Sequence, residues 1–433
     1  MLSISIIREQ KEDVVRRLSI KNFNDAELID EVISSDELRR KAQFGLDALL
    51  AKQNDLSKQV GELYKSGKAK EADELKKENN ALKEESKKWS DQLEKAEKNL
   101  NDLLVRIPNL PSEKVKPGKS AADNEIVFQN AREVALHDAA VPHWDLAAKY
   151  GIIDFEKGNK ITGAGFPVYT AKGAKLQRGL INYFLDKAAE AGYVEVQPPV
   201  LVNEESAFGT GQLPDKEGQM YHIISDDFYL VPTAEVPVTN LMRNQIIKSS
   251  ELPVKFTAYT PCFRREAGSY GKDVRGLNRL HQFDKVEIVQ IVHPDKSYDT
   301  LEQMKEHVSS LVESLRLPFR ILRLCGGDMS FASALTYDFE VYSAAQKKWL
   351  EVSSVSNFES FQANRLKMRY REGNEKPHLV HTLNGSALAL PRIVAALLEN
   401  NQQPDGIMIP EILVPYTGFD RIDGSDVKMN LKY

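Results

Sequence analysis

The sequence predicts an α+β protein in which an N-terminal antiparallel α-helical coiled-coil hairpin precedes an antiparallel β-sheet domain flanked by helices. Residues 25–106 are rich in Lys, Glu, Leu and Ala, are nearly free of proline and glycine, and place apolar residues three and four positions apart. Beyond residue 118, helical stretches alternate with short β-like runs. These runs are often separated by too little chain for helical crossovers, which favours antiparallel pairing.

Two apolar stripes predict the helical hairpin, and a short break at residues 65–68 separates them. The first comprises Leu46, Leu49, Leu56, Val60 and Leu63, and the second comprises Leu75, Leu82, Trp89, Leu93, Ala96, Leu100 and Leu103. Gln53, Asn79 and Ser86 are polar interruptions of these stripes. A helix of about 38 residues would be roughly 57 Å long. Taken alone, the segment favours a dimerisation or spacer coiled coil over an RNA-binding arm.

A proline-rich linker follows the hairpin, because Pro108, Pro111 and Pro117 cannot continue a helix. We therefore expect an arm at residues 1–108, a linker at 109–125, a second domain at 126–420 and a polar tail at 421–433. In the second domain the pattern predicts helices at 173–191 and 299–315, and strands at 228–231, 254–259, 285–292, 319–324 and 336–342.

The composition is that of a protein with a substantial core: 42% of the 433 residues are hydrophobic and 28% are charged. Because the net charge is −5, a nucleic acid would have to bind local basic patches. Cys262 and Cys325 lack CxxC spacing, which argues against disulfides and a cysteine-rich zinc site. Residues 1–11 lack the apolar run of a signal peptide, and no stretch has the roughly 20 apolar residues of a membrane span. We therefore expect a cytoplasmic protein with no membrane partner.

The usual nucleotide-binding motifs are incomplete. The string 118–120 (GKS) resembles the end of a P-loop, but Glu113 occupies the position of the upstream glycine. The string 163–165 (GAG) lacks the third glycine of a dinucleotide fingerprint, and HExxH and GxSxG patterns are absent. An ATP site in this chain would therefore have to be formed by a different motif.

One strand–loop–strand pattern has the features of such an ATP-binding motif. Arg264 and Glu266 follow a β-like run and precede a Gly-rich basic segment at 267–276, after which Phe283, Lys285 and Glu287 alternate along a second run. Alternate strand residues share a face, so these side chains can point into one site. An arginine suits the α-phosphate of ATP, a carboxylate suits the adenine amino group, and an aromatic ring can stack on the base. The short FRxE string alone favours an ordinary charged hairpin, but the HQFD string at 281–284 disfavours that alternative.

The block from Phe263 to Glu287 resembles motif 2 of the class II aminoacyl-tRNA synthetases, in the bacterial-like form typical of the seryl-tRNA synthetase family. The resemblance covers nearly the whole chain, arm included, to about residue 420. The string 233–235 resembles the serine-binding TAE loop, and 351–357 resembles the ATP and metal segment. The string 384–389, followed by Arg392, resembles motif 3. Family members usually have glycine before this arginine, whereas this chain has Pro391.

The resemblance implies a role for each matching residue. The catalytic residues would be Arg264, Glu266 and Arg392. Serine would contact Thr233, Ala234, Glu235, Arg264, Glu287, Asn384 and Ser386. ATP would contact Arg264, Arg265, Glu266, Phe283, Glu351, Val352, Ser353, Ser354 and Arg392. Glu351 and Ser354 would ligate Mg²⁺, a hard cation that prefers oxygen ligands.

The implied reaction converts L-serine and ATP to seryl-adenylate and pyrophosphate, then transfers serine to the 3′ end of tRNA(Ser), with tRNA(Sec) left open as a second acceptor. The resemblance also implies a class II catalytic domain in a homodimer, with each arm reaching tRNA bound across to the other subunit. The alternatives are another class II synthetase, an amino acid:carrier-protein ligase and a non-catalytic RNA-binding paralogue. The N-terminal hairpin, the TAE string and the set of charged motif residues favour the seryl enzyme.

Overall fold

The computed structural model describes residues 1–215, 217–266 and 275–425. The chain forms two compact units, one of residues 1–19 and 23–108 and the other of residues 20–22 and 109–433. Among the described residues, no helix combines the length and the apolar character needed to cross a membrane.

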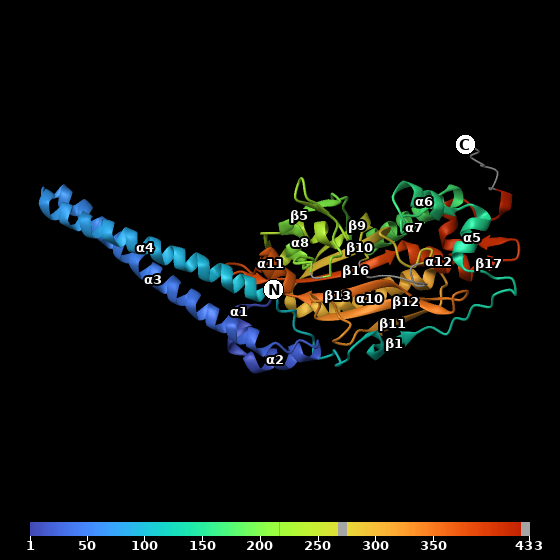
Figure 1. Cartoon of the computed structure of the whole chain (residues 1–433), viewed down its shortest axis with the longest axis horizontal. Helices are drawn as coiled ribbons and strands as arrows, with labels where there is room; N and C mark the ends of the chain where they lie inside the picture. Colours follow the sequence, from blue (N-terminus) through green and yellow to red (C-terminus); the bar gives the residue numbers. More distant parts are fainter. Residues whose placement is uncertain (216, 267–274, 426–433) are drawn as a thin grey trace. The chain divides into compact units, whose positions relative to one another are not determined.

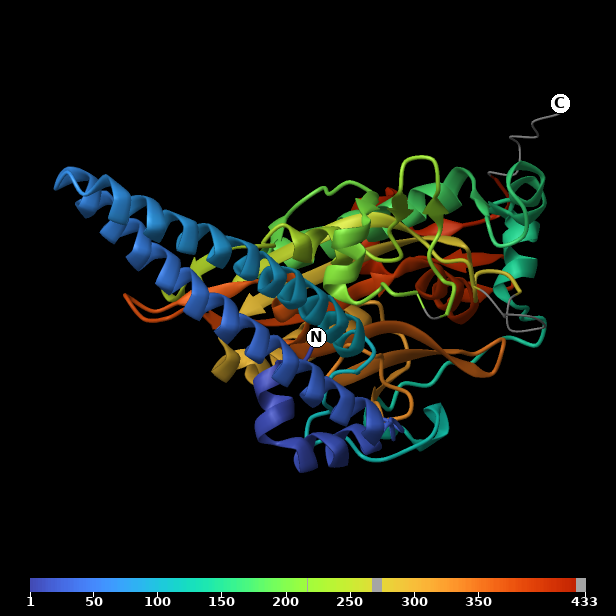
Figure 2. The ribbon, with the colours of Figure 1, turned by 60° about the vertical axis from the view of Figure 1, so that its left-hand side comes forward.

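The first unit is the predicted helical hairpin, which is confirmed. Its helices are α1 (Ile4–Glu9), α2 (Lys11–Ile20), α3 (Ala26–Lys65) and α4 (Ala69–Leu104). The Asp25 side chain caps α3 by accepting a 3.0 Å hydrogen bond from the Leu28 backbone N–H. The chain reverses between α3 and α4, where Gly67 adopts a φ of +77° that favours glycine. The two long helices then run side by side (Figures 1 and 2).

The polar interruptions of the two stripes are partnered across the hairpin. Gln53 Nε2 donates to the Leu82 carbonyl at 2.7 Å and to Ser86 Oγ at 2.9 Å. Asn79 Nδ2 donates to Ser57 Oγ at 2.9 Å. A shift of either helix along the other would break these hydrogen bonds. The polar residues therefore specify the register of the two helices, which apolar contacts alone define only weakly.

The second unit is built on an eight-stranded sheet with the order β1-β11-β12-β13-β16-β10-β9-β4. Its strands are β1 (Glu125–Gln129), β4 (Val194–Glu195), β9 (Val254–Phe263), β10 (Gln282–Val292), β11 (Phe319–Arg323), β12 (Leu335–Ser343), β13 (Lys348–Glu359) and β16 (His381–Ala389). Every neighbouring pair is antiparallel except β4 and β9, which confirms the predicted antiparallel sheet.

Three helices pack against this sheet and share its main hydrophobic core: α7 (Ala171–Glu190), α10 (Ser297–Ser314) and α12 (Leu390–Asn400). The other helices are α5 (His143–Tyr150), α6 (Phe155–Ile161), α8 (Glu204–Thr210), α9 (Glu235–Asn240), α11 (Phe361–Leu366) and α13 (Val414–Thr417). Short 3₁₀ turns occupy Ala121–Asp123, Ser249–Glu251, Pro294–Lys296 and Glu411–Leu413.

Smaller sheets border the large one. Their strands are β2 (Ile153–Asp154), β3 (Val168–Tyr169), β5 (Leu201–Asn203), β6 (His222–Ile223), β7 (Phe228–Leu230), β8 (Ile246–Lys248), β14 (Arg369–Arg371), β15 (His378–Leu379), β17 (Gln402–Gln403), β18 (Gly406–Met408) and β19 (Arg421–Ile422). The predicted helices correspond to α7 and α10, and the five predicted strands correspond to β7, β9, β10, β11 and β12. Of the predicted tail, residues 426–433 lie outside the described residues.

Candidate active site

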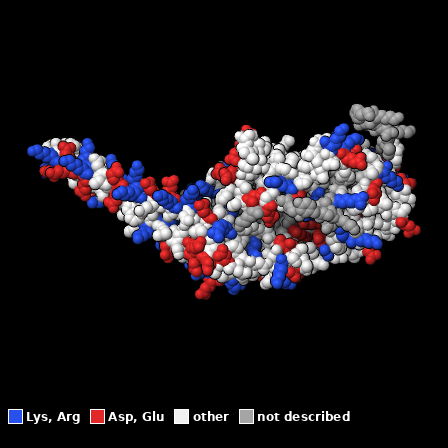
Figure 3. Space-filling view, in the orientation of Figure 1, with Lys and Arg blue, Asp and Glu red and all other residues white. Residues whose placement is uncertain are grey.

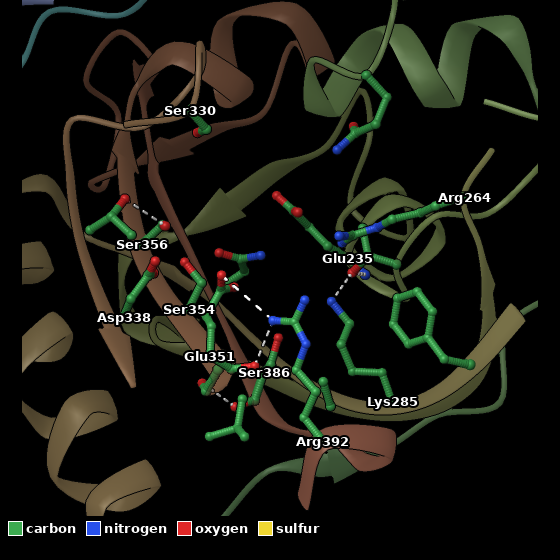
Figure 4. A pocket seen from close by; sticks show the side chains of 18 of the residues that line it. Glu235, Arg264, Lys285, Ser330, Asp338, Glu351, Ser354, Ser356, Ser386 and Arg392 are labelled. Atoms are coloured by element: carbon green, nitrogen blue, oxygen red, sulfur yellow. Dashed lines mark hydrogen bonds and ion pairs between the residues drawn. The ribbon is translucent and has the colours of Figure 1, made fainter. Parts of the chain in front are cut away.

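A cavity of about 560 Å³ opens above the middle of the large sheet. Most of the predicted site residues line it: Thr233, Glu235, Arg264, Glu266, Phe283, Glu351, Val352, Ser353, Ser354, Asn384, Ser386 and Arg392. Figure 4 shows that several of these side chains converge from different strands. Ala234, Arg265 and Glu287 are predicted site residues outside the lining of this cavity.

The β9–β10 pair brings Arg264 and Phe283 together, as their alternation predicts. Antiparallel register places Phe263 opposite Gln282, and the Arg264 backbone N–H donates to the His281 carbonyl at 2.9 Å. The Arg264 guanidinium therefore lies over the Phe283 ring, 5.3 Å from its centroid. This cation–π contact holds a positive charge at the cavity wall.

Glu266 lies at the end of the same described segment. It forms an ion pair with Arg279, and both side chains line the cavity. Its φ of +48° is a backbone conformation that non-glycine residues rarely adopt. The Gly-rich basic segment that follows was predicted at 267–276, and its residues 267–274 lie outside the described residues.

Glu235, the first residue of α9, is a buried carboxylate at one end of the cavity. Burial, together with the negative charge of Glu287, raises its pKa to about 7. Gln362 Nε2 donates to Glu235 Oε1 at 2.7 Å. A cationic ligand bound beside Glu235 would therefore stabilise the ionised form of this carboxylate.

Glu287 lies behind the cavity wall and is already well partnered. The Lys285 ammonium lies 2.6 Å from Glu287 Oε2, and Asn384 Nδ2 donates to Oε1 at 3.0 Å. The hydroxyls of Thr233 and Ser386 each lie 3.4 Å from Oε2. Glu287 thus orients four cavity-lining polar side chains.

An oxygen-rich corner lies at the β12–β13 pair, where Asp338 is directly opposite Ser354. Both residues and Glu351 line the cavity, and Figure 4 shows the three side chains close together. Asp338 Oδ1 is buried without a hydrogen-bond partner among the described residues. Burial and the charge of Glu351 hold the pKa of Asp338 well above its usual range. The ionised forms of these two carboxyl groups therefore disfavour one another.

Arg392 crosses from α12 to that corner. Its Nε donates to the Asn278 carbonyl at 2.9 Å, and its Nη1 donates to the Glu351 carbonyl at 2.8 Å. Pro391 lies at the start of α12, where a missing N–H costs the helix nothing, and Arg392 still lines the cavity.

The sequence patterns did not identify Asp338 or Gln362 as site residues. Asp338 lies on β12 two positions from Thr336, which also lines the cavity, but no predicted site residue lies on this strand to mark which of its faces meets the cavity. Gln362 lies on the short helix α11, where no motif distinguishes it from a surface glutamine.

Comparisons with known proteins agree with this geometry. The family description "tRNA synthetase class II core domain (G, H, P, S and T)" matches residues 221–401, and "Seryl-tRNA synthetase N-terminal domain" matches residues 1–111. A serine–tRNA ligase of Salinibacter ruber is 51% identical over 424 residues, which cover 98% of this chain and 99% of the relative.

Two solved structures resemble the whole chain. The seryl-tRNA synthetase from Pyrococcus horikoshii complexed with ATP has a TM-score of 0.89 at 31% identity, covering 98% of this chain and 99% of that one. The cytoplasmic serine–tRNA ligase from Naegleria fowleri in complex with AMP has a TM-score of 0.84 at 26% identity, with the same coverage of both chains. Together with the motif residues that meet in the cavity, these likenesses show that the chain belongs to the seryl-tRNA synthetase family and is a class II serine–tRNA ligase.

Proposed function

We propose that the cavity joins L-serine to the α-phosphate of ATP and then transfers serine from the adenylate to the 3′ end of tRNA(Ser). The observation that carries the proposal is the convergence of Glu235, Arg264, Glu351 and Arg392 on one cavity. The likeness to the Pyrococcus horikoshii structure complexed with ATP supports ATP as the nucleotide.

Adenylate formation brings a carboxylate and a phosphate together, so catalysis consists mainly of positioning and charge neutralisation. Arg264 bridges the serine carboxylate and the α-phosphate from its place over Phe283. Arg392 holds the outer phosphates, and Glu266 and Phe283 position adenine. Arg265, which lies outside the cavity lining, also contributes to ATP binding. No protein nucleophile is needed in this scheme, because the serine carboxylate is itself the attacking group.

Serine selection uses the opposite end of the cavity. Glu235 and Thr233 bind the ammonium group, while Ser386 and Glu287 recognise the hydroxyl. Asn384 completes the wall, and Ala234 contributes from behind it. A site built to hydrogen-bond a hydroxyl rejects an analogue without it by roughly 10⁴-fold, because its buried polar groups would otherwise lose their partners. Alanine is therefore excluded by unpaired polar groups, and threonine by lack of room for its methyl.

The β12–β13 corner fits a magnesium ion. In the part of the chain that the structure describes, Asp338 Oδ1 is a buried acceptor without a partner, and Glu351 and Ser354 add a carboxylate and a hydroxyl beside it. Among residues 1–215, 217–266 and 275–425, no three His, Cys, Asp or Glu side chains form a metal-binding cluster. Mg²⁺ commonly combines one or two carboxylates with water and substrate phosphates. The ion would neutralise phosphate charge, and Glu351 with Ser354 would hold it.

The second step requires tRNA, which the helical hairpin would bind. Lysine and arginine side chains are interspersed with acidic ones along α3 and α4 (Figure 3), so the hairpin offers local cationic contacts despite the net charge of −5. We place the reaction in the cytoplasm, in a homodimer whose arms reach tRNA on the opposite subunit. Acceptance of tRNA(Sec) stays open.

Pyrophosphate exchange with a panel of amino acids, followed by addition of total tRNA, tests the proposal. Serine-dependent exchange and subsequent charging of tRNA(Ser) are the expected results. Exchange with another amino acid would discard the serine assignment. Exchange without charging would favour a carrier-protein ligase, and folded protein without any exchange would favour a non-catalytic RNA-binding protein.

A further inference from the structure

A buried histidine–glutamate pair lies behind the cavity. His143 begins α5 and Glu399 lies near the end of α12, and both are 0% exposed. Nδ1 of His143 lies 2.6 Å from Oε1 of Glu399, which also accepts the backbone N–H of His143 at 2.9 Å. Neither residue lines the cavity, and the chemistry described above uses neither.

The hydrogen bonds assign the tautomer of this histidine. The Leu277 backbone N–H donates to Nε2 of His143 at 2.8 Å, so Nε2 presents a lone pair. The ring proton is therefore on Nδ1, where it is donated to Glu399. His143 thus links the glutamate on α12 to the backbone of a residue that lines the cavity.

The contacts continue from the glutamate to Arg392. Gln346 Nε2 donates to Glu399 Oε1 at 2.8 Å, and Asn278 Nδ2 donates to Gln346 Oε1 at 2.9 Å. The Asn278 carbonyl accepts the 2.9 Å hydrogen bond from Arg392 Nε. His143 and Gln346 therefore hold the two consecutive residues, 277 and 278, of which the second orients the arginine.

Two further contacts fix the same segment. Gly276 has a φ of +68°, and a Cβ built there would lie 2.2 Å from Nε2 of His143, so no other residue fits without displacing the ring. The Arg275 guanidinium lies over the Trp144 ring, 4.6 Å from its centroid. Residues 275–278 are therefore held against the start of α5.

We propose that His143 is a positioning residue for the ATP end of the cavity. Together with Glu399 and Gln346 it holds Leu277 and Asn278 in place, so that the Asn278 carbonyl aims Arg392 at the outer phosphates. This inference rests on the proposed ATP-binding role of Arg392. Thr233 and Glu235, at the serine end, make no hydrogen bond to this network. Disruption of the network should therefore change the KM for ATP and not the KM for serine.

The test compares His143→Leu and Gln346→Ala with His381→Leu in pyrophosphate exchange. His381 is a half-buried histidine outside the cavity lining, with a 2.8 Å hydrogen bond to Ser297 Oγ, and serves as the control. We expect the KM for ATP to rise about tenfold in the first two variants, with the KM for serine within about twofold of wild type. In the control, both KM values should stay unchanged even if the melting temperature falls.

A purely structural role predicts something different, because loss of folded enzyme lowers kcat and leaves both KM values unaltered. That result in His143→Leu and Gln346→Ala would overturn the inference. Gln346 is only half-buried, so its variant carries the test if His143→Leu does not fold. In His143→Gln the side-chain amide oxygen can accept from the Leu277 N–H, and we expect partial recovery of the KM for ATP. Absence of serine-dependent exchange in the wild-type protein would refute the proposed function itself, whereas an active wild type with unaffected variants would refute this inference alone.

Discussion

The side-chain amide of Gln362 donates a hydrogen bond of 2.7 Å to the carboxylate of Glu235, from a position 127 residues later in the chain. The amide is itself held on both sides: Thr382 Oγ1 donates to its Oε1 at 2.7 Å, and its Nε2 also donates to the Thr210 carbonyl at 3.1 Å. These hydrogen bonds therefore orient a buried carboxylate at the proposed serine end of the cavity, which favours selective binding of a small amino acid.

Replacing Gln362 by leucine should weaken serine binding. Glu235 would lose its closest donor and part of its orientation, so we expect the KM for serine to rise about tenfold and the KM for ATP to stay constant. Pyrophosphate exchange at varied serine and ATP measures both. Gln290→Leu is the control, since Gln290 is a buried glutamine that donates to Tyr193 Oη at 2.7 Å outside the cavity lining. Equal KM values for serine in the two variants would remove the role assigned to Gln362.

The KM for serine should depend on pH near neutrality. Burial raises the pKa of Glu235 to about 7, and in the proposed function only the ionised carboxylate would pair with the serine ammonium group. As the pH falls below about 7, the ionised fraction of Glu235 decreases and the KM for serine should rise, approaching about tenfold per pH unit. Above that pH it should level off.

The variant Glu235→Gln supplies the control for this profile. It should have a high KM for serine that no longer changes across the same pH range, because its amide does not titrate. A wild-type KM for serine that stays constant through pH 7 would contradict the assignment of Glu235 to the ammonium group.

Arg264→Ala should reduce pyrophosphate exchange by about 10²- to 10³-fold, because the charge that bridges the two reacting anions is lost. Its far-ultraviolet circular dichroism should match wild type. Arg320→Ala is a suitable control: this arginine lies over the Trp349 ring and pairs with Glu340 outside the cavity lining. Exchange at the wild-type rate in folded Arg264→Ala would show that the reaction proceeds without this guanidinium.

Glu351→Gln should raise the Mg²⁺ concentration needed for half-maximal exchange, by roughly tenfold or more. Loss of a carboxylate from the β12–β13 corner also weakens direct binding of Mn²⁺ in the presence of ATP, which electron paramagnetic resonance can measure. Glu340→Gln is the matched control, since Glu340 lies on β12 but is paired with Arg320. Identical metal dependence in the two variants would exclude Glu351 as a ligand.

Shortening the helical hairpin should separate the two half-reactions. Replacing residues 47–87 by a short glycine–serine turn keeps Trp89, which packs closely on Gly45, and removes about 28 Å of paired helix. Serine-dependent exchange should stay within about twofold of wild type, while tRNA charging falls by about tenfold or more. Unchanged charging would mean that the distal hairpin has no part in tRNA binding.

The local pattern of residues predicted much of the fold. The helical hairpin could be predicted because the spacing of apolar residues is a local pattern within each helix and does not depend on residues far away in the chain. Helices α7 and α10 also lie within two residues of their predicted bounds. Strand β13 was not among the predicted strands, because serines at positions 353, 354 and 356 weaken its apolar pattern. Pairing with β12 and β16 on either side supplies the stability that its own residues lack.

The sequence by itself determined the hairpin, the antiparallel sheet and the clustering of Arg264 with Phe283, since each depends on neighbours in the chain or on one hairpin register. Only the tertiary structure decided that Glu287 lies behind the cavity, that Asp338 lies near enough to Glu351 to be affected by its charge, and that His143 reaches Leu277. Those relationships join residues on different elements. They arise from packing and from the need to pair buried polar groups, and local patterns do not encode either.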